Sequence, residues 1–159
     1  MTLPMVSLTL KPWEGLPLEH TFGHKSLVNY DGTAMFAELA IQRMAAANGW
    51  SARWVCVYGA KATAPRFLTD WLDAPLRDQK VVVIDKPRQD LLNKIRKQNH
   101  GSYSGCWDVL AWKGERTVFI ESKRNKKDHI RATQLEWRWA GLRAGVTADS
   151  FVVAQWEFA

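Results

Sequence analysis

The sequence lacks the features of several large protein classes. Its two cysteines, Cys56 and Cys106, are far apart and form no CxxC pair, so two reduced thiols are expected rather than a disulfide framework or a thiolate zinc site. No apolar run approaches the roughly 20 residues that a membrane helix needs. Residues 1–10 have neither the basic start nor the apolar centre of a signal peptide. We therefore expect a globular protein in the cytoplasm, with no membrane partner.

Acidic residues are also in the minority, since 22 lysines and arginines face 16 aspartates and glutamates. The resulting charge of +6 favours a polyanionic partner, although basic runs on a protein are often only solvated surface. The basic residues gather in two runs, at 86–97 and 123–131. We expect contacts to nucleic-acid phosphates from Lys94, Arg96, Lys97, Arg124, Lys126, Lys127 and Arg131.

The chain divides into an N-terminal extension, residues 1–30, and a core domain, residues 31–159. The extension contains Pro4, Pro12 and Pro17 and shows no sustained hydrophobic period. Periodicity in the core predicts a helix capped by Thr33 and ending at Asn48-Gly49, a strand at 52–58, a short helix at 67–72, a strand at 80–84, a helix at 88–98, strands at 107–112 and 117–123, a helix at 131–143 and a strand at 151–156. This order indicates an α/β fold with a mixed central sheet and helices on both faces.

Chemistry concentrates in the two strands around residue 115. Glu121 and Lys123 are two positions apart, so in a strand they share a face, whereas Ser122 lies on the other. The segment 113–116 is typical of a hairpin turn. A two-residue turn at Lys113-Gly114 would pair position 112 with 115 and place Asp108 diagonal to Glu121, and a turn over residues 113–116 would pair 112 with 117 and place it directly opposite. An odd turn would need a bulge to bring both carboxylates to one face.

Two carboxylates about 5 Å apart repel by roughly 3 kcal/mol at an effective dielectric of about 20, so a cation is expected between them. Oxygen ligands without a histidine or cysteine cluster suit Mg²⁺ or Mn²⁺. Such an ion would bind a phosphate oxygen and activate water, and Lys123 would orient or deprotonate that water or neutralise charge on the phosphate. Asp85, after the strand at 80–84, is a rival acid, but its position favours a helix cap.

These residues resemble the PD-(D/E)XK nuclease superfamily, and within it the VRR-NUC branch. The matching positions are Gly105, Asp108, Glu121, Lys123, Gln134, Trp137 and Gly145. Trp107 stands where that family usually has proline, and the Arg-Arg-Asn element of the branch is missing. The resemblance implies a restriction-endonuclease-like core.

The resemblance also implies a role for each site residue. Asp108 and Glu121 would hold the metal with the Ser122 carbonyl, and Lys123 would be catalytic. Gln134 would position water or phosphate, and Glu38 on the first helix would be an outer acid.

The sequence thus predicts a Mg²⁺- or Mn²⁺-dependent endonuclease acting on DNA. The resemblance adds branched or flapped DNA as substrate, and a homodimer. Two alternatives stay open, a nucleic-acid-binding module with the same fold that does not cleave, and an accessory protein of phage or defence systems. Four of the nine tryptophans, at 107, 112, 137 and 139, lie close in sequence to the site, where they would either stack on bases or pack in the core.

Overall fold

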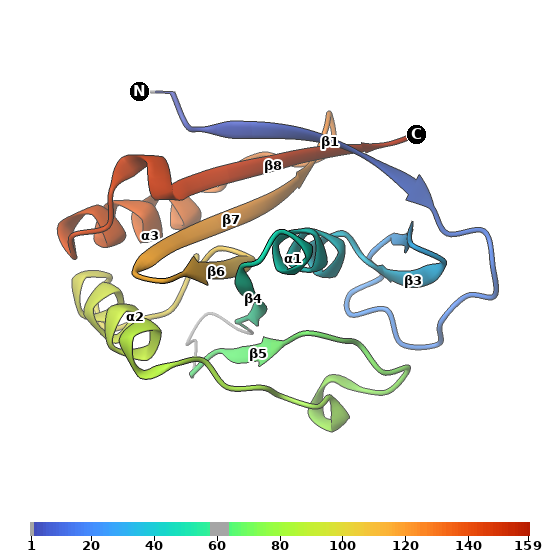
Figure 1. The fold of residues 1–159 in the computed structure, drawn as a ribbon, viewed down its shortest axis with the longest axis horizontal. Helices are drawn as coiled ribbons and strands as arrows, with labels where there is room; N and C mark the ends of the chain where they lie inside the picture. Colours follow the sequence, from blue (N-terminus) through green and yellow to red (C-terminus); the bar gives the residue numbers. More distant parts are fainter. Residues whose placement is uncertain (1, 58–63) are drawn as a thin grey trace.

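The computed structural model describes residues 2–57 and 64–159. Its elements, in chain order, are β1 (Met5–Pro12), β2 (Leu27–Tyr30), β3 (Thr33–Phe36), α1 (Ala37–Ala47), β4 (Ser51–Cys56), β5 (Arg66–Leu68), the 3-10 turn η1 (Leu76–Asp78), α2 (Lys86–Gln98), β6 (Val109–Lys113), β7 (Arg116–Arg124), α3 (Ala132–Arg143), the 3-10 turn η2 (Ala148–Ser150) and β8 (Phe151–Phe158) (Figure 1).

The strands form one mixed sheet in the order β3-β2-β1-β8-β7-β6-β4-β5. The central strand β8 is parallel to both of its neighbours, β1 and β7, and the other pairs are antiparallel. The α/β fold with a mixed sheet is as the sequence predicts. β1 and β2 come from residues 1–30, the segment that the sequence separates from the core, and β1 pairs with β8 from Met5↔Val153 to Leu10↔Phe158.

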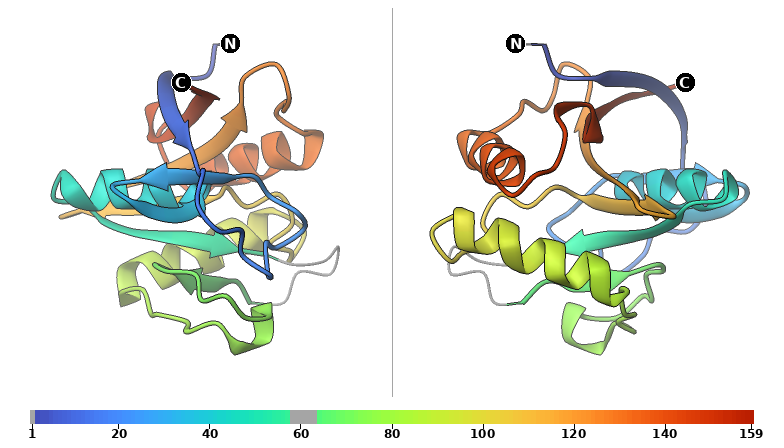
Figure 2. Two further views of the ribbon diagram at one scale, coloured as in Figure 1. Left: turned by 90° about the vertical axis from the view of Figure 1, so that its right-hand side faces the viewer. Right: turned by 60° about the vertical axis from the view of Figure 1, so that its left-hand side comes forward.

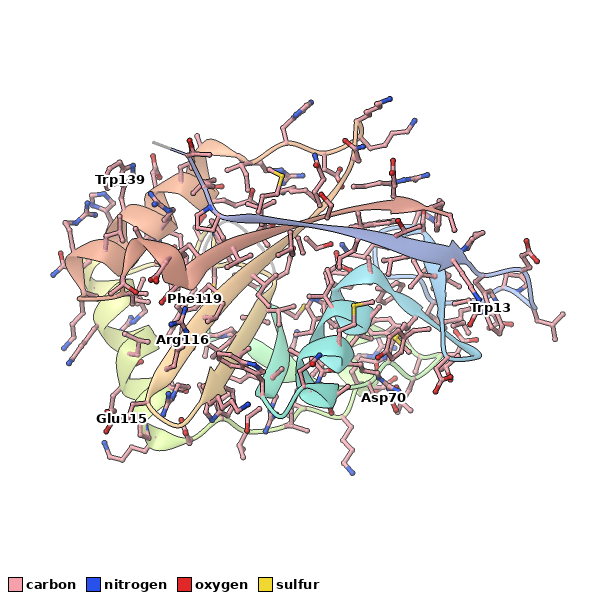
Figure 3. All side chains as sticks on the ribbon, turned by 45° about the horizontal axis from the view of Figure 1, so that its top comes forward. Trp13, Asp70, Glu115, Arg116, Phe119 and Trp139 are labelled. Atoms are coloured by element: carbon pink, nitrogen blue, oxygen red, sulfur yellow. The ribbon has the colours of Figure 1, made fainter. Side chains whose placement is uncertain are left out.

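The β6–β7 hairpin has the register that brings the candidate residues together. Trp112 pairs with Thr117, and Val109 with Ile120, so the next position along places Asp108 opposite Glu121. The turn has even parity because Lys113 and Arg116 also pair, and Gly114 at φ 60° supplies the left-handed conformation that the tight turn requires. Glu115 and Arg116 lie at the turn of the hairpin (Figure 3), whereas Asp108 and Glu121 lie at the opposite end of its two strands.

Alternation along β6 places its residues in different core clusters, and Figure 2 shows the helices around the sheet that contribute to them. Leu110 packs in a cluster that includes Ile95 of α2 and Trp137 of α3. Val109, one position earlier, packs in a different cluster with Ile41 of α1. Since neighbouring strand residues point to opposite faces, the helices that approach Leu110 and Val109 hold the sheet from different directions.

Helices α2 and α3 and strands β4 and β8 agree with the sequence within a few residues, except that Tyr58, in the predicted strand 52–58, lies outside the described residues. Asp85 is a helix cap, as predicted, since its Oδ1 accepts from the backbone N of Arg88 at 2.9 Å. The helix of residues 33–48 begins later than predicted. Asp31 and Gly32 both have positive φ, which turns the chain into a β2–β3 hairpin before α1 starts at Ala37.

Two further predictions were wrong. Residues 66–68 form β5 rather than part of a helix, because Phe67 and Leu68 pair with Val55 and Trp54 of β4. Residues 80–84 make only an isolated bridge, Phe67↔Val82, and Val83 is 81% exposed, so the apolar run does not mark a buried strand. None of the described helices is long and apolar enough to cross a membrane.

Candidate active site

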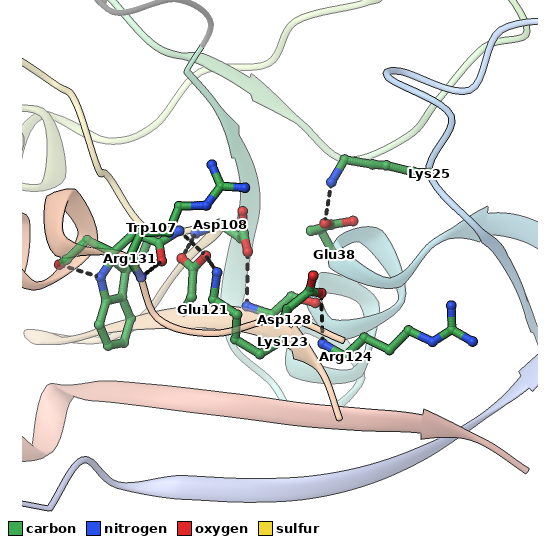
Figure 4. A network of polar contacts seen from close by, with 11 residues as sticks. Lys25, Glu38, Trp107, Asp108, Glu121, Lys123, Arg124, Asp128 and Arg131 are labelled. Carbon is green, nitrogen blue, oxygen red and sulfur yellow. Dashed lines mark hydrogen bonds and ion pairs between the residues drawn. The ribbon is translucent and has the colours of Figure 1, made fainter. Parts of the chain in front are cut away.

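Asp108 and Glu121 meet where the β6–β7 ladder ends (Figure 4). The backbone N of Asp108 donates to Glu121 Oε2 at 3.2 Å, and the backbone N of Ser122 donates to Asp108 Oδ2 at 2.9 Å. Each carboxylate therefore accepts a hydrogen bond from the backbone of the opposite strand, at the point where the backbone pairing of the hairpin ends. Glu121 is 2% exposed, so it forms the floor of the site.

Lys123 lies beside Glu121, as their spacing in β7 predicts. Its Nζ is 3.3 Å from Glu121 Oε1, and its side chain is only 10% exposed. Its positive charge is therefore largely out of contact with solvent and lies next to the Glu121 carboxylate.

Gln134 joins α3 to this floor. Its Nε2 donates to Glu121 Oε1 at 2.8 Å, while its Oε1 accepts from the backbone N of Arg131 at 2.9 Å. The second bond ties Gln134 to the start of the helix and fixes which end of the amide faces the carboxylate. Gln134 thus orients Glu121.

The loop before β6 packs tightly on the same helix end. Gly105 has φ +80°, and a Cβ there would overlap the backbone carbonyl of Thr133. Trp107, two residues later, donates its indole N–H to the carbonyl of Gln134 at 3.0 Å. Glycine is therefore required at position 105 for the loop and α3 to hold Asp108 and Gln134 at their present separation.

The electrostatics of the floor favour a bound cation. Burial, followed by the charge of Glu38, raises the pKa of Asp108 from 3.8 to about 6. Burial, followed by the charge of Asp108, raises the pKa of Glu121 well above its usual range. Burial also raises the pKa of the nearby Cys106 thiol, which argues against a thiolate nucleophile. Cys106 and Cys56 are both free, as predicted.

These side chains line a polar cavity of about 420 Å³ that also contains a second carboxylate and ammonium pair, Glu38 and Lys25. Lys25 Nζ donates to Glu38 Oε1 at 2.7 Å. Burial lowers the pKa of Lys25, but Glu38, Asp108 and Asp128 outweigh that effect, raise it above 10.5, and keep the ammonium charged. Glu38 is therefore at the site but already has a cation.

The residues expected to bind nucleic acid separate into two groups. Arg131 lines the cavity, and Arg124 and Lys127 line a second cavity beside it. Lys126 is exposed in the same loop, with φ 62°. The structure places the other three, Lys94, Arg96 and Lys97, on α2, outside the lining of either cavity.

Of the four tryptophans near the site, those at positions 107, 112 and 137 are buried in the core. Trp139 is 49% exposed on the outer side of α3 (Figure 3). Of the two roles expected for these tryptophans, three of the four side chains therefore have core packing.

The oxygen donors of the first cavity suit a hard divalent cation, although only a few of them lie close together. Within residues 2–57 and 64–159, no group of three or more His, Cys, Asp and Glu side chains is placed to hold a metal ion. The available set consists of two carboxylates, Asp108 and Glu121, with the Ser122 carbonyl predicted to join them. Oxygen donors of this kind match Mg²⁺ or Mn²⁺, which keep several waters when they bind to proteins.

Lys25 and Asp128 are the site residues that sequence reasoning missed. Lys25 belongs to a turn in which Phe22, Gly23 and His24 all have positive φ, and no periodic pattern marks it. The Asp31-Gly32 turn after it was a usable signal, because Asp-Gly between short apolar runs is typical of a hairpin. Asp128 is the acid within the basic run, and its Oδ2 accepts from the backbone N of Arg124 at 3.0 Å.

Comparisons with protein-family models, with curated proteins and with solved structures give no match for this chain. The arrangement of Asp108, Glu121, Lys123 and Gln134 therefore carries the functional argument by itself.

Proposed function

We propose that the protein is a Mg²⁺- or Mn²⁺-dependent endonuclease that hydrolyses DNA phosphodiester bonds on a core of the PD-(D/E)XK type, with helices on both faces of the sheet. One observation carries the proposal. Asp108 and Glu121 adjoin at the floor of a polar cavity, with the Lys123 ammonium 3.3 Å from Glu121. Paired carboxylates with an adjacent lysine are suited to phosphoryl-transfer chemistry.

The roles follow from the positions of the side chains. Asp108, Glu121 and the Ser122 carbonyl would hold the ion, which when bound supplies Lewis acidity toward a phosphate oxygen and lowers the pKa of a bound water. As an ammonium, Lys123 orients the attacking water or neutralises charge that develops on the phosphate, and as a neutral amine it would take the proton that this water loses. As the water oxygen bonds to phosphorus, the ester bond to the leaving sugar oxygen breaks and that oxygen takes a proton. Gln134 keeps Glu121 in place throughout.

The basic surface supports a nucleic-acid substrate. Arg124, Lys127 and Arg131 line the two cavities and would contact phosphates without reading bases. The proposal includes a cytoplasmic location, which the two free thiols support. Branched or flapped DNA and a homodimer belong to it as well, and sedimentation of the protein with and without such DNA tests both.

The test is cleavage of linear, flapped and four-way DNA with Mg²⁺, Mn²⁺ or EDTA, using the wild type, Asp108→Asn and Lys123→Met. Calorimetric titration with Mn²⁺ measures metal binding separately from cutting. We expect cleavage that needs metal and both side chains. Cutting in EDTA, or full activity in both variants, would refute the proposal, and tight DNA binding without cutting in any metal would favour the non-cleaving module.

A further inference from the structure

A second polar cavity, of about 320 Å³, adjoins the first one. Four residues line both cavities, namely Lys25, Glu38, Ser122 and Asp128. The Lys25–Glu38 ion pair therefore stands at the boundary between the two. A ligand that extends beyond the Asp108–Glu121 floor on this side enters the second cavity.

Arg124 lines the second cavity, and among the described residues its guanidinium has no ion pair. Its Cζ lies 4.7 Å from the ring centre of Phe158 and 5.5 Å from that of Trp156, so the two aromatic rings of β8 support it. No hydrogen bond from this guanidinium to another described residue is found, and Lys127, which also lines the cavity, has no ion pair within the same residues. Arg124 is thus held by two aromatic rings without an ion pair to a protein anion, while Lys127 is exposed beside it.

The carboxylates nearby are already engaged. Asp128 Oδ2 accepts from the backbone N of Arg124 at 3.0 Å, and Glu38 accepts from Lys25 at 2.7 Å. The cavity lining therefore has three cations, Lys25, Arg124 and Lys127, against two carboxylates that have donors. An arginine supported in this way presents a planar set of N–H groups that matches a phosphate better than a lysine does.

We propose that the second cavity binds the phosphodiester adjacent to the one that is cut, through Arg124 and Lys127. The inference rests on the proposed function and defines its substrate class as a nucleic-acid strand with at least two consecutive phosphates. A small phosphodiester with one phosphate reaches only the Asp108–Glu121 floor. The subsite then determines substrate affinity and leaves the chemistry at the floor unchanged.

The first experiment compares two substrates, an oligonucleotide and bis(4-nitrophenyl) phosphate, which carries a single phosphate. We expect Arg124→Ala and Lys127→Ala to lower kcat/KM for the oligonucleotide about 10- to 100-fold, mostly through KM, and to lower it clearly less for the small diester. Lys80→Ala, which removes an exposed lysine outside both cavities, is the matched control. Equal losses on both substrates, or no loss on either, would overturn the subsite.

The second experiment is independent of cutting. Fluorescence anisotropy in EDTA measures binding of oligonucleotides that carry one neutral methylphosphonate at successive positions. We expect one position to weaken binding to the wild type by about tenfold and to have no further effect in Lys127→Ala, whose exposed side chain is not needed for folding. Additive losses at every position would refute the subsite. Loss of cleavage with this binding pattern intact would sink the proposed function alone.

Arg124 also packs on β8, so its removal is checked against a conservative variant. Arg124→Lys keeps the charge and loses the planar N–H set. We expect Arg124→Lys to recover the melting temperature of the wild type and to bind the oligonucleotide more weakly than the wild type does. Binding equal to that of the wild type would show that charge alone accounts for the contact and would overturn the assigned role of Arg124.

Discussion

The site contains two Glu–Lys pairs that differ in how they are held. Glu121 and Lys123 come from one strand, and their side chains are 2% and 10% exposed. Glu38 and Lys25 come from a helix and a turn, lie closer together at 2.7 Å, and have side chains that are 10% and 35% exposed. The shorter contact is the more open one. The N–O distance therefore does not indicate which pair is held more firmly. Solvent exposure does, and it indicates that Glu121–Lys123 is the fixed pair of the site, whereas Glu38–Lys25 can exchange its contact for water.

The largest expected effect separates the two lysines. Lys123→Met removes the enclosed cation beside Glu121, and we expect single-turnover cleavage to fall about 10³-fold. Lys25→Met, at the more exposed pair, should lower it only about tenfold, because solvent and nearby lysines partly replace its charge. Quenched-flow cleavage with Lys80→Met as control measures both. Equal losses in the two variants would remove the distinction between the pairs.

The second prediction tests how rigidly the floor is built. Gly105→Ala places a methyl group on the Thr133 carbonyl, so we expect the free energy of unfolding to fall by at least about 2 kcal/mol and cleavage to fall with it. Gly101→Ala is the matched control, since Gly101 also has positive φ, +74°, but has open space around its Cα. That variant should lose about 1 kcal/mol. Denaturant unfolding of both variants measures the difference, and equal losses would show that the loop does not hold α3.

The third prediction concerns pH. Because the pKa of Asp108 is raised to about 6, the metal-free site holds a proton there that a divalent ion has to displace. We expect the dissociation constant for Mn²⁺ to rise by at least about tenfold for each pH unit below about pH 6, because Glu121, whose pKa is also raised, adds a second proton for the ion to displace. Calorimetric titration between pH 5 and pH 8 measures this. An affinity independent of pH would place the ion elsewhere, for example at Glu38.

The fourth prediction concerns stability without metal. A carboxyl group whose pKa is higher in the folded chain than in the unfolded chain stabilises the fold while it is protonated, and that contribution is lost as the pH rises from about 4 to about 6. Asp108→Asn should therefore raise the free energy of unfolding at pH 7.5 by about 1 to 3 kcal/mol while abolishing cleavage. Asp90→Asn, at an exposed acid, is the control. A destabilised Asp108→Asn would contradict the raised pKa.

The smallest effect is expected at the open pair. Glu38→Gln should change the free energy of unfolding by less than about 1 kcal/mol, because the Lys25 side chain is 35% exposed and water partly replaces the lost partner. It should also lower the pKa of Asp108, since Glu38 is one of the causes that raise it. Thermal melting and NMR titration of the carboxyl carbons check the two statements. A loss of stability as large as that expected for Gly105→Ala would make Glu38 part of the fixed floor.

The contrast between the pairs also explains what the sequence could predict. The shared face of Glu121 and Lys123, the even turn before them and the cap at Asp85 depend on neighbours within about a dozen residues, and all three are as predicted. Lys25 meets Glu38 only after β2 and β3 have paired, and no periodicity specifies that meeting.

The wrong predictions have the same origin. At residues 67–72, pairing of β5 with β4 overrides the helical spacing of the apolar residues. β1 was missed although Val6, Leu8 and Leu10 alternate with polar residues, which is a usable strand signal, and its partner β8 lies at the far end of the chain.

The place of β8 in the sheet has a consequence for the order of folding. β8 joins β7, which carries the fixed pair, to β1 and so to the β2–β3 hairpin that follows Lys25. β1 pairs with residues almost 150 positions later, for example Met5 with Val153, whereas the β6–β7 hairpin closes locally. Contacts between such distant segments form slowly, and during synthesis they wait for residues 151–158 to leave the ribosome. The nascent chain is therefore expected to form the Asp108–Glu121 floor early and to complete the cavity above it last.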